Sequence, residues 1–159
     1  MIIEVCVNSA FSAIEAMKGG AHRVELCENL HDGGTTPSAG TIRLARKKID
    51  ISLFVMIRPR GGDFLYSDEE FDIMKEDIQV ARASGADGVV FGILKPDGTI
   101  DAERMDTLVK LARPMGITCH RAFDMTADPF TAMEELVRLR IDRILTSGQK
   151  PTAYEGAGL

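Results

Sequence analysis

The same short motif, a glutamate and a cysteine two residues apart, occurs in two apolar segments of the chain. These are Glu4-Val5-Cys6 and Glu25-Leu26-Cys27. Side chains alternate along a strand, so each glutamate shares a face with its cysteine. Adjacent strands lie about 4.8 Å apart, and thiolates prefer soft ions, so Cys6 and Cys27 predict a metal site between two strands. Packing is the alternative, because free cysteine is often a small buried hydrophobe and barrel strands are staggered.

A cluster of cationic side chains follows the third apolar run. The run from Ile51 to Ile57 ends at Arg58 and Arg60, and Asp63 comes shortly after two glycines. Ligands bind at the carboxyl ends of parallel strands, so these residues predict a site for a small anion. A solvated surface loop is the alternative interpretation. We also expect Arg58 to act as the counter-ion of the inward-facing glutamates, because buried carboxylates are costly unless paired.

A second polar group follows the fifth and sixth apolar runs. His120 ends the fifth run beside Arg121 and Asp124, and Thr146 and Ser147 end the sixth. A histidine at this edge can act as an acid, a base or a ligand. Hydroxyl groups and backbone N–H groups can bind an anion. A structural histidine and a simple turn are the alternatives.

Segments typical of strands and helices alternate along the chain, which indicates βαβ repeats. The strands are apolar on both sides, as in a parallel sheet with both faces covered. An open doubly wound sheet and a (β/α)₈ barrel both fit, but no Gly-x-Gly-x-x-Gly motif follows the first strand. The predicted strands are 2–7, 23–27, 51–57, 88–94, 116–120 and 143–146, and the predicted helices are 9–18, 38–48, 68–84, 101–112, 129–139 and one beginning at Tyr154.

Length and composition are those of an ordinary globular protein. The 159 residues allow one domain with a hydrophobic core. The net charge of −5 and the pI near 5.2 disfavour nucleic acid and membrane surfaces as partners. The first residues lack the basic region of a signal peptide, and three cysteines, an odd number, predict reduced thiols in the cytosol.

With these motifs in this order, the chain resembles the CutC family, which is named for copper homeostasis. The motifs run through almost the whole chain, and the Arg-Pro-Arg-Gly-Gly-Asp-Phe stretch is especially specific. They are Glu4 to Val7, Gly20 to Cys27, Gly33 to Ser38, Met56 to Ser67, Gly85 to Gly92, His120 to Asp124 and Arg143 to Gln149.

The resemblance implies a TIM-barrel-like fold, a cytoplasmic location and binding of Cu(I). The family's proposed copper cysteines match Cys6 and Cys27 in this sequence. A complete barrel needs eight strands and about 250 residues, so residues 1–159 are expected to form one partial barrel with about six strands. Its outer strands would be open edges, prone to pairing with another copy of the chain.

Three functional hypotheses follow. In the first, the protein is a cytosolic copper-homeostasis protein with Cys6 and Cys27 as thiolate ligands. In the second, it is an enzyme for a small anionic metabolite, in which the arginines hold the anion, His120 moves a proton, and Glu4 or Glu25 is the carboxylate partner. In the third, it is a non-functional partial barrel whose polar edge is inherited from a longer relative.

Overall fold

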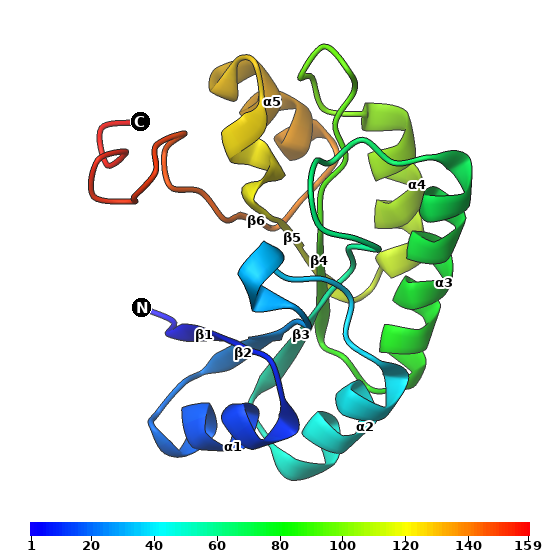
Figure 1. The fold of residues 1–159 in the computed structure, drawn as a ribbon, viewed down its shortest axis with the longest axis vertical. Coiled ribbons are helices and arrows are strands. Elements are labelled where there is room, and N and C mark those ends of the chain that lie inside the picture. Colours follow the sequence, from blue (N-terminus) through cyan, green and yellow to red (C-terminus); the bar gives the residue numbers. More distant parts are fainter.

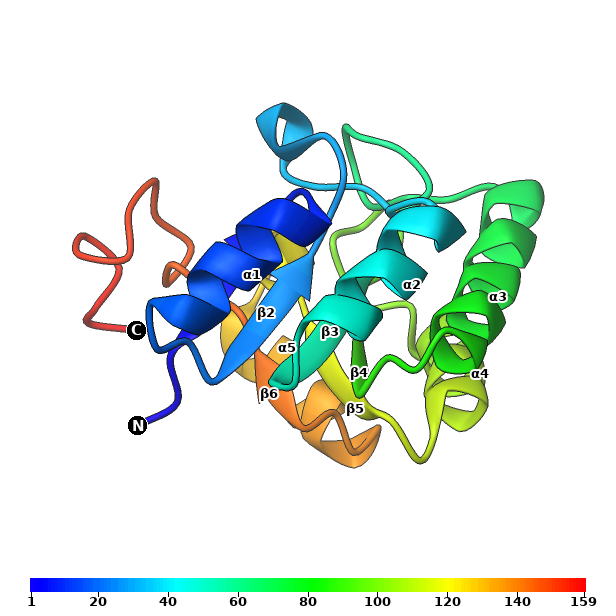
Figure 2. The same cartoon turned by 90° about the horizontal axis from the view of Figure 1, so that it is seen from below.

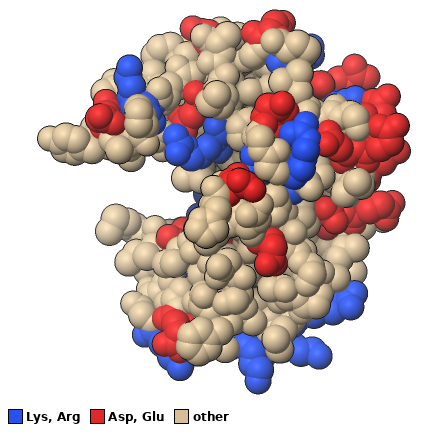
Figure 3. Space-filling model, in the orientation of Figure 1, with Lys and Arg blue, Asp and Glu red and all other residues tan.

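Six parallel strands lie side by side in chain order in the computed structural model, which describes residues 1–159. The sheet curls around an interior, and the helices that connect the strands line its outer face (Figures 1 and 2). The outer strands β1 and β6 each pair with one neighbour only, so the barrel is open between them. Figure 3 shows a hollow on the side of the molecule where both chain ends lie. This confirms the predicted partial TIM-barrel-like architecture.

The elements alternate as predicted, with boundaries within a few residues of the expected ones. The longest helix has 16 residues, and no helix combines the length and apolarity that crossing a membrane requires. The strands are β1 (Glu4–Val7), β2 (Arg23–Leu26), β3 (Ser52–Met56), β4 (Gly88–Phe91), β5 (Gly116–Cys119) and β6 (Arg143–Ile144). The helices are α1 (Ala10–Lys18), α2 (Ala39–Lys48), α3 (Asp68–Ala83), α4 (Ala102–Ala112) and α5 (Pro129–Arg138), with short 3₁₀ helices η1 (Leu30–Asp32) and η2 (Arg121–Met125).

Each α-helix begins where a short polar side chain replaces the missing helical hydrogen-bond partner. The capping residues are Ser9, Ser38, Ser67, Asp101 and Asp128, and each accepts a hydrogen bond from the amide three residues further on. This is the usual N-cap arrangement, which satisfies an amide that the helix itself leaves free. Ser9 and Asp128 thus mark the starts of the helices predicted at 9–18 and 129–139.

Strand alternation sorts apolar from polar residues between the two faces of the sheet. Val24 and Leu26 are fully buried in the large core between sheet and helices. Glu25 and Cys27 point to the interior of the curl, where Cys27 belongs to a smaller buried cluster with Phe54. The alternation arises because successive side chains of a strand point to opposite faces of the sheet. The interior is therefore where the chemically active side chains gather.

The helix predicted from Tyr154 is wrong. Residues 151–158 form successive bends and turns instead, with an N–H to C=O hydrogen bond from Gly156 to Thr152. Glycine is a poor helix former, and the backbone of Gly156 lies directly against Gly148. A Cβ at Gly148 would lie 2.0 Å from the Gly156 carbonyl oxygen, so this close approach needs glycine on both sides.

One aromatic ring fills the amino-terminal end of the curled interior. Phe54 lies between two guanidinium groups, with the Cζ of Arg23 4.6 Å and that of Arg143 4.5 Å from the ring centre. The ring also occupies the space where side chains of Gly88 and Gly116 would project. A Cβ on Gly88 would lie 2.3 Å from the ring carbons, so the ring fits only because these strand positions carry no side chain.

Replacing Gly88 with alanine is therefore expected to destabilise the protein by about 1–3 kcal/mol, because an added methyl group overpacks a buried site. Urea unfolding followed by circular dichroism measures the change. Gly40→Ala is the matched control. Gly40 lies exposed in α2 with its nearest heavy atom at 3.7 Å, so alanine there should leave stability unchanged or raise it by up to about 1 kcal/mol. Equal effects of the two changes would contradict the steric argument.

Candidate functional site

The carboxyl ends of the strands surround a hollow of about 480 Å³. Residues from β1, β2, β3 and the segments after β2, β3, β5 and β6 line it, so widely separated parts of the chain meet there. This is the edge of a parallel α/β sheet where ligands bind. Its lining includes Cys6, Glu25, Asp32, Met56, Arg58, Phe64, His120, Arg121 and Asp124.

The structure brings Cys6 and Cys27 together despite a stagger between their strands. Cys6 is level with Glu25 in the β1–β2 register, and Cys27 lies two residues further along the chain, just past the end of β2. The two Sγ atoms are nevertheless 3.3 Å apart. Glu25 Oε1 lies 3.8 Å from Cys6 Sγ and 3.7 Å from Cys27 Sγ. These three residues form the one cluster of potential metal ligands in the structure, with all ligand atoms within 4.8 Å of one another.

The electrostatic surroundings of this cluster separate the two thiols. Cys6 is exposed, and a hydrogen bond from Cys27 lowers the pKa of its thiol. The hydrogen bond to Cys6, together with burial, raises the pKa of Cys27. Burial also raises the pKa of Glu25 to about 7, with a further contribution from the charge of Glu4. Cys6 is therefore the thiol that loses its proton first.

Gly34, in the loop after β2, leaves space for the cluster of Cys6, Glu25 and Cys27. Gly34 has a φ of +89° and lies against Cys27, so an added Cβ would be 3.1 Å from the Cys27 Cβ and 3.2 Å from its Sγ. The Met56 methyl group lies near the same point and places a thioether side chain beside Cys27. The Gly33-Gly34 pair can be seen in the sequence, but only the folded structure shows that Gly34 lies against Cys27.

The short distance between the sulfur atoms predicts that a mild oxidant will join Cys6 to Cys27. A disulfide bond is about 2.05 Å long, so the sulfurs need to move little to form it. Treatment with diamide, which takes up the two thiol hydrogens, should lower the protein's mass by two hydrogen atoms and block alkylation at both residues. Cys6→Ser should abolish the bond, whereas Cys119→Ala should not, because Cys119 is buried on the helix side of the sheet. Persistent alkylation of both thiols would contradict the prediction.

Arg58 does not pair with the glutamates, so that part of the prediction is wrong. Its guanidinium is buried and donates hydrogen bonds to the main-chain oxygens of Asp32 at 2.6 Å, Gly34 at 2.9 Å and Gly62 at 2.7 Å. The loops after β2 and β3 curve around it, and their carbonyl groups are closer than any carboxylate. Glu4 instead forms an ion pair with Arg23 on the neighbouring strand.

Arg60 and Asp63 stabilise their own loop. Arg60 Nε donates to Glu70 Oε1 at 2.6 Å, and Arg60 Nη2 donates to Asp63 Oδ1 at 3.1 Å. Glu70 also belongs to the capping box with Ser67 that begins α3. The charge of Arg60 is therefore already neutralised at the start of a helix, and Arg60 does not line the hollow.

His120 is buried at the centre of the site as a neutral imidazole. Burial and the charge of Arg58 lower its pKa to about 3. Its Nδ1 accepts a hydrogen bond from the Ala122 amide at 3.2 Å, which assigns the proton to Nε2. The Phe64 ring packs against it with 4.8 Å between ring centres. Nε2 has no hydrogen-bond partner, so the residue presents an N–H donor instead of a proton acceptor.

Asp124 holds together the segments that follow β5 and β6. Its carboxylate accepts hydrogen bonds from Thr146 Oγ1 at 2.5 Å, Arg121 Nε at 2.7 Å, the Ser147 amide at 3.0 Å and the Gln149 amide at 3.1 Å. Burial would raise its pKa, but the hydrogen bonds from Thr146, Arg121 and these amides lower it overall to about 2. The hydroxyl and amide groups predicted to receive an anion are thus used by an internal carboxylate.

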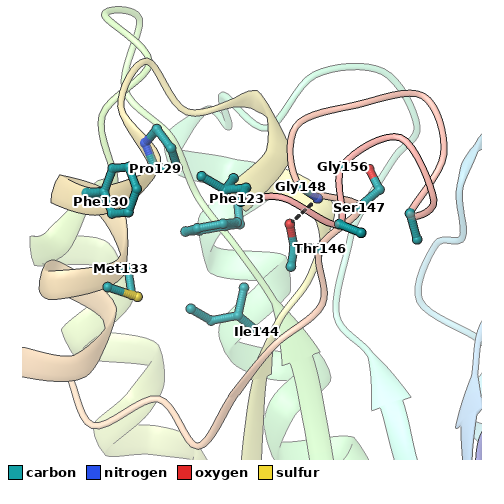
Figure 4. A pocket seen from close by; sticks show the side chains of 12 residues that line it. Phe123, Pro129, Phe130, Met133, Ile144, Thr146, Ser147, Gly148 and Gly156 are labelled. Atoms are coloured by element: carbon teal, nitrogen blue, oxygen red, sulfur yellow. Dashed lines mark hydrogen bonds between the residues drawn. The ribbon is translucent and has the colours of Figure 1, made fainter.

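A second hollow, of about 360 Å³, lies between α5 and the last residues of the chain (Figure 4). Phe130 and Met133 of α5 line it together with Phe123, and the backbone of Gly148 faces them across the space. Its walls carry no titratable side chain. The chemistry is therefore concentrated in the hollow around Cys6, Arg58 and His120.

Comparison with known proteins agrees with this fold. The profile described as the CutC family matches residues 1–159. The copper homeostasis protein cutC homologs of Mus musculus and Homo sapiens are 54% and 52% identical to this chain over 158 residues, which is 99% of its length. The chain spans 58% of the length of these two relatives.

Solved structures show the same architecture. A protein from Streptococcus agalactiae assigned as the copper homeostasis protein CutC superposes with a TM-score of 0.91 at 38% identity, covering 99% of this chain and 79% of that one. An oxaloacetate acetylhydrolase gives a TM-score of 0.61 at 16% identity, covering 98% of this chain and 57% of that one. At such low identity the second match shows a shared fold alone.

Proposed function

This chain belongs to the CutC family, and from that premise we propose that it is a cytosolic copper-homeostasis protein that binds Cu(I) through Cys6 and Cys27. The observation that carries the proposal is the 3.3 Å separation of the two sulfur atoms. Two metal–sulfur bonds of about 2.3 Å span at most about 4.6 Å, so both sulfurs can reach one ion.

The donor set favours a soft ion. Thiolates and thioethers select Cu(I) among biological metals, and the Met56 thioether side chain lies in the same buried cluster as Cys27. Glu25 is the third potential ligand, and its raised pKa near 7 shows that a carboxylate there is costly without a nearby positive charge. A bound cation would supply that charge.

An anaerobic titration with Cu(I) against a competing chelator tests the proposal. The expected result is tight binding of one ion per chain, with sulfur atoms as its nearest neighbours in X-ray absorption spectra. A parallel titration with Zn²⁺ compares the soft ion with a borderline one. Weak Cu(I) binding, or an ion surrounded only by oxygen and nitrogen atoms, would refute the thiolate site.

A further inference from the structure

Arg58 carries a buried positive charge that no carboxylate neutralises. Its residue is 4% exposed, and all its hydrogen-bond acceptors are neutral carbonyl groups. Arginine is almost never fully buried unless its charge is paired, because desolvating an unpaired charge is costly. Arg121, the other arginine that lines the hollow, forms an ion pair with Asp124. Arg58 is therefore the one unneutralised arginine of this hollow.

His120 lines the same hollow as Arg58 and carries a buried hydrogen-bond donor that has no acceptor. The side chain is 3% exposed, and its Nε2–H lacks an acceptor. Leaving a buried donor without a partner costs about 1–3 kcal/mol, so such groups are rare unless something outside the chain completes them. The Phe64 ring contacts both groups, with 4.8 Å to the His120 ring centre and 5.0 Å to the Arg58 Cζ. All three residues line the same hollow, so an unneutralised charge and an unpaired donor meet at one cavity.

We propose that this hollow binds a small monocarboxylate, whose acidic group accepts the His120 Nε2–H hydrogen bond and neutralises Arg58. A volume of about 480 Å³ suits a small organic molecule. A single free positive charge favours a monoanion over a phosphate dianion, because Asp32, Asp124 and Glu25 also line the cavity and would repel additional negative charge. The site uses none of the sulfur atoms, so it is separate from the copper site that it adjoins.

Isothermal titration and thermal melting of the reduced, copper-free protein test this with sodium acetate, lactate, pyruvate and benzoate. Sodium phosphate and sodium chloride at the same ionic strength are the comparison anions. We expect at least one monocarboxylate to bind saturably and to raise the melting temperature, since a ligand of the folded state stabilises it. Cys119→Ala, which changes a thiol outside the hollow, should bind it equally well, and the absence of copper from the sample separates this binding from the metal site.

His120→Asn is the decisive variant. Its amide oxygen can still accept the Ala122 N–H, but its side chain lacks the distal donor, so binding should weaken at least roughly tenfold. His22→Asn is the matched control, because His22 Nδ1 likewise accepts a backbone N–H, from Ile3 at 3.1 Å, far from the hollow. His120→Gln, which restores a distal N–H, should recover part of the affinity.

Nuclear magnetic resonance of the unmodified protein tests the proposal without depending on whether a variant folds. The imidazole nitrogen resonances of His120 should report an Nε2–H tautomer that shifts on addition of the bound monocarboxylate. Three results would overturn the proposal: no binding of any monocarboxylate, equal binding by His120→Asn, or binding of phosphate in preference to the carboxylates.

Discussion

Replacing both Cys6 and Cys27 with serine is expected to weaken Cu(I) binding by more than about 100-fold. Changes to outer-shell partners of a metal typically cost about 10–100-fold, and removal of the ligands themselves should cost more. Serine oxygen is a poor donor for this soft ion. Anaerobic competition titration measures the loss, with circular dichroism on the same samples to confirm that the variant is folded.

Cys119→Ala is the control for this change. Cys119 lies one residue before His120 but packs in the core between sheet and helices, and burial raises its pKa to about 12. Its replacement should therefore leave Cu(I) affinity unaltered. Glu25→Gln should cost at least about tenfold, the smallest effect typical of an outer-shell change, because Glu25 lies within 3.8 Å of both sulfurs and is the third potential ligand. A folded double variant that still bound Cu(I) tightly would place the metal elsewhere.

Replacing Asp124 with asparagine is expected to destabilise the protein by about 2 kcal/mol at neutral pH. The Asp124 pKa of about 2 lies below its ordinary value of 3.8, and each unit corresponds to about 1.4 kcal/mol. Because the folded-state pKa is depressed, this stability is fully present above pH 3.8 and is lost as the pH falls through 2. The difference between wild type and variant should therefore be large at pH 7 and shrink towards pH 2.

Urea unfolding at several pH values measures this difference. Asp128→Asn is the matched acid-to-amide control, because asparagine caps a helix about as well as aspartate does. It should change stability little at any pH. A deficit in Asp124→Asn that stayed constant down to pH 2 would show that shape, and not the ionised carboxylate, holds the segment after β6.

The sequence was sufficient for the parts of the fold that depend on local patterns. Alternation along the strand predicted that Glu25 and Cys27 share a face, and the helices predicted at 9–18 and 129–139 start within one residue of α1 and α5. The turns from Tyr154 onward were wrongly predicted as a helix, because the reason for them is the contact between Gly148 and Gly156. Neither segment alone contains a sequence pattern that predicts such a contact.

The site was only partly predictable for the same reason. Alternation along each strand predicted that Cys6 and Cys27 face the interior. It could not predict that Cys6 is level with Glu25, because this depends on the register between β1 and β2. The partners of Arg58 are main-chain carbonyl oxygens, which every residue carries, so residue type gives no information about which carbonyl will accept.

The packing of Phe54 implies that positions 54, 88 and 116, which are far apart in the sequence, restrict one another's side chains. A ring at position 54 requires glycine at 88 and leaves little space at 116, where a Cβ would lie 2.8 Å from the ring. A smaller side chain at position 54 would leave space for side chains at 88 and 116. It would also remove the ring on which Arg23 and Arg143 stack. A single substitution at any of the three positions is therefore expected to be destabilising, and a redesign of the barrel interior has to treat them as one unit.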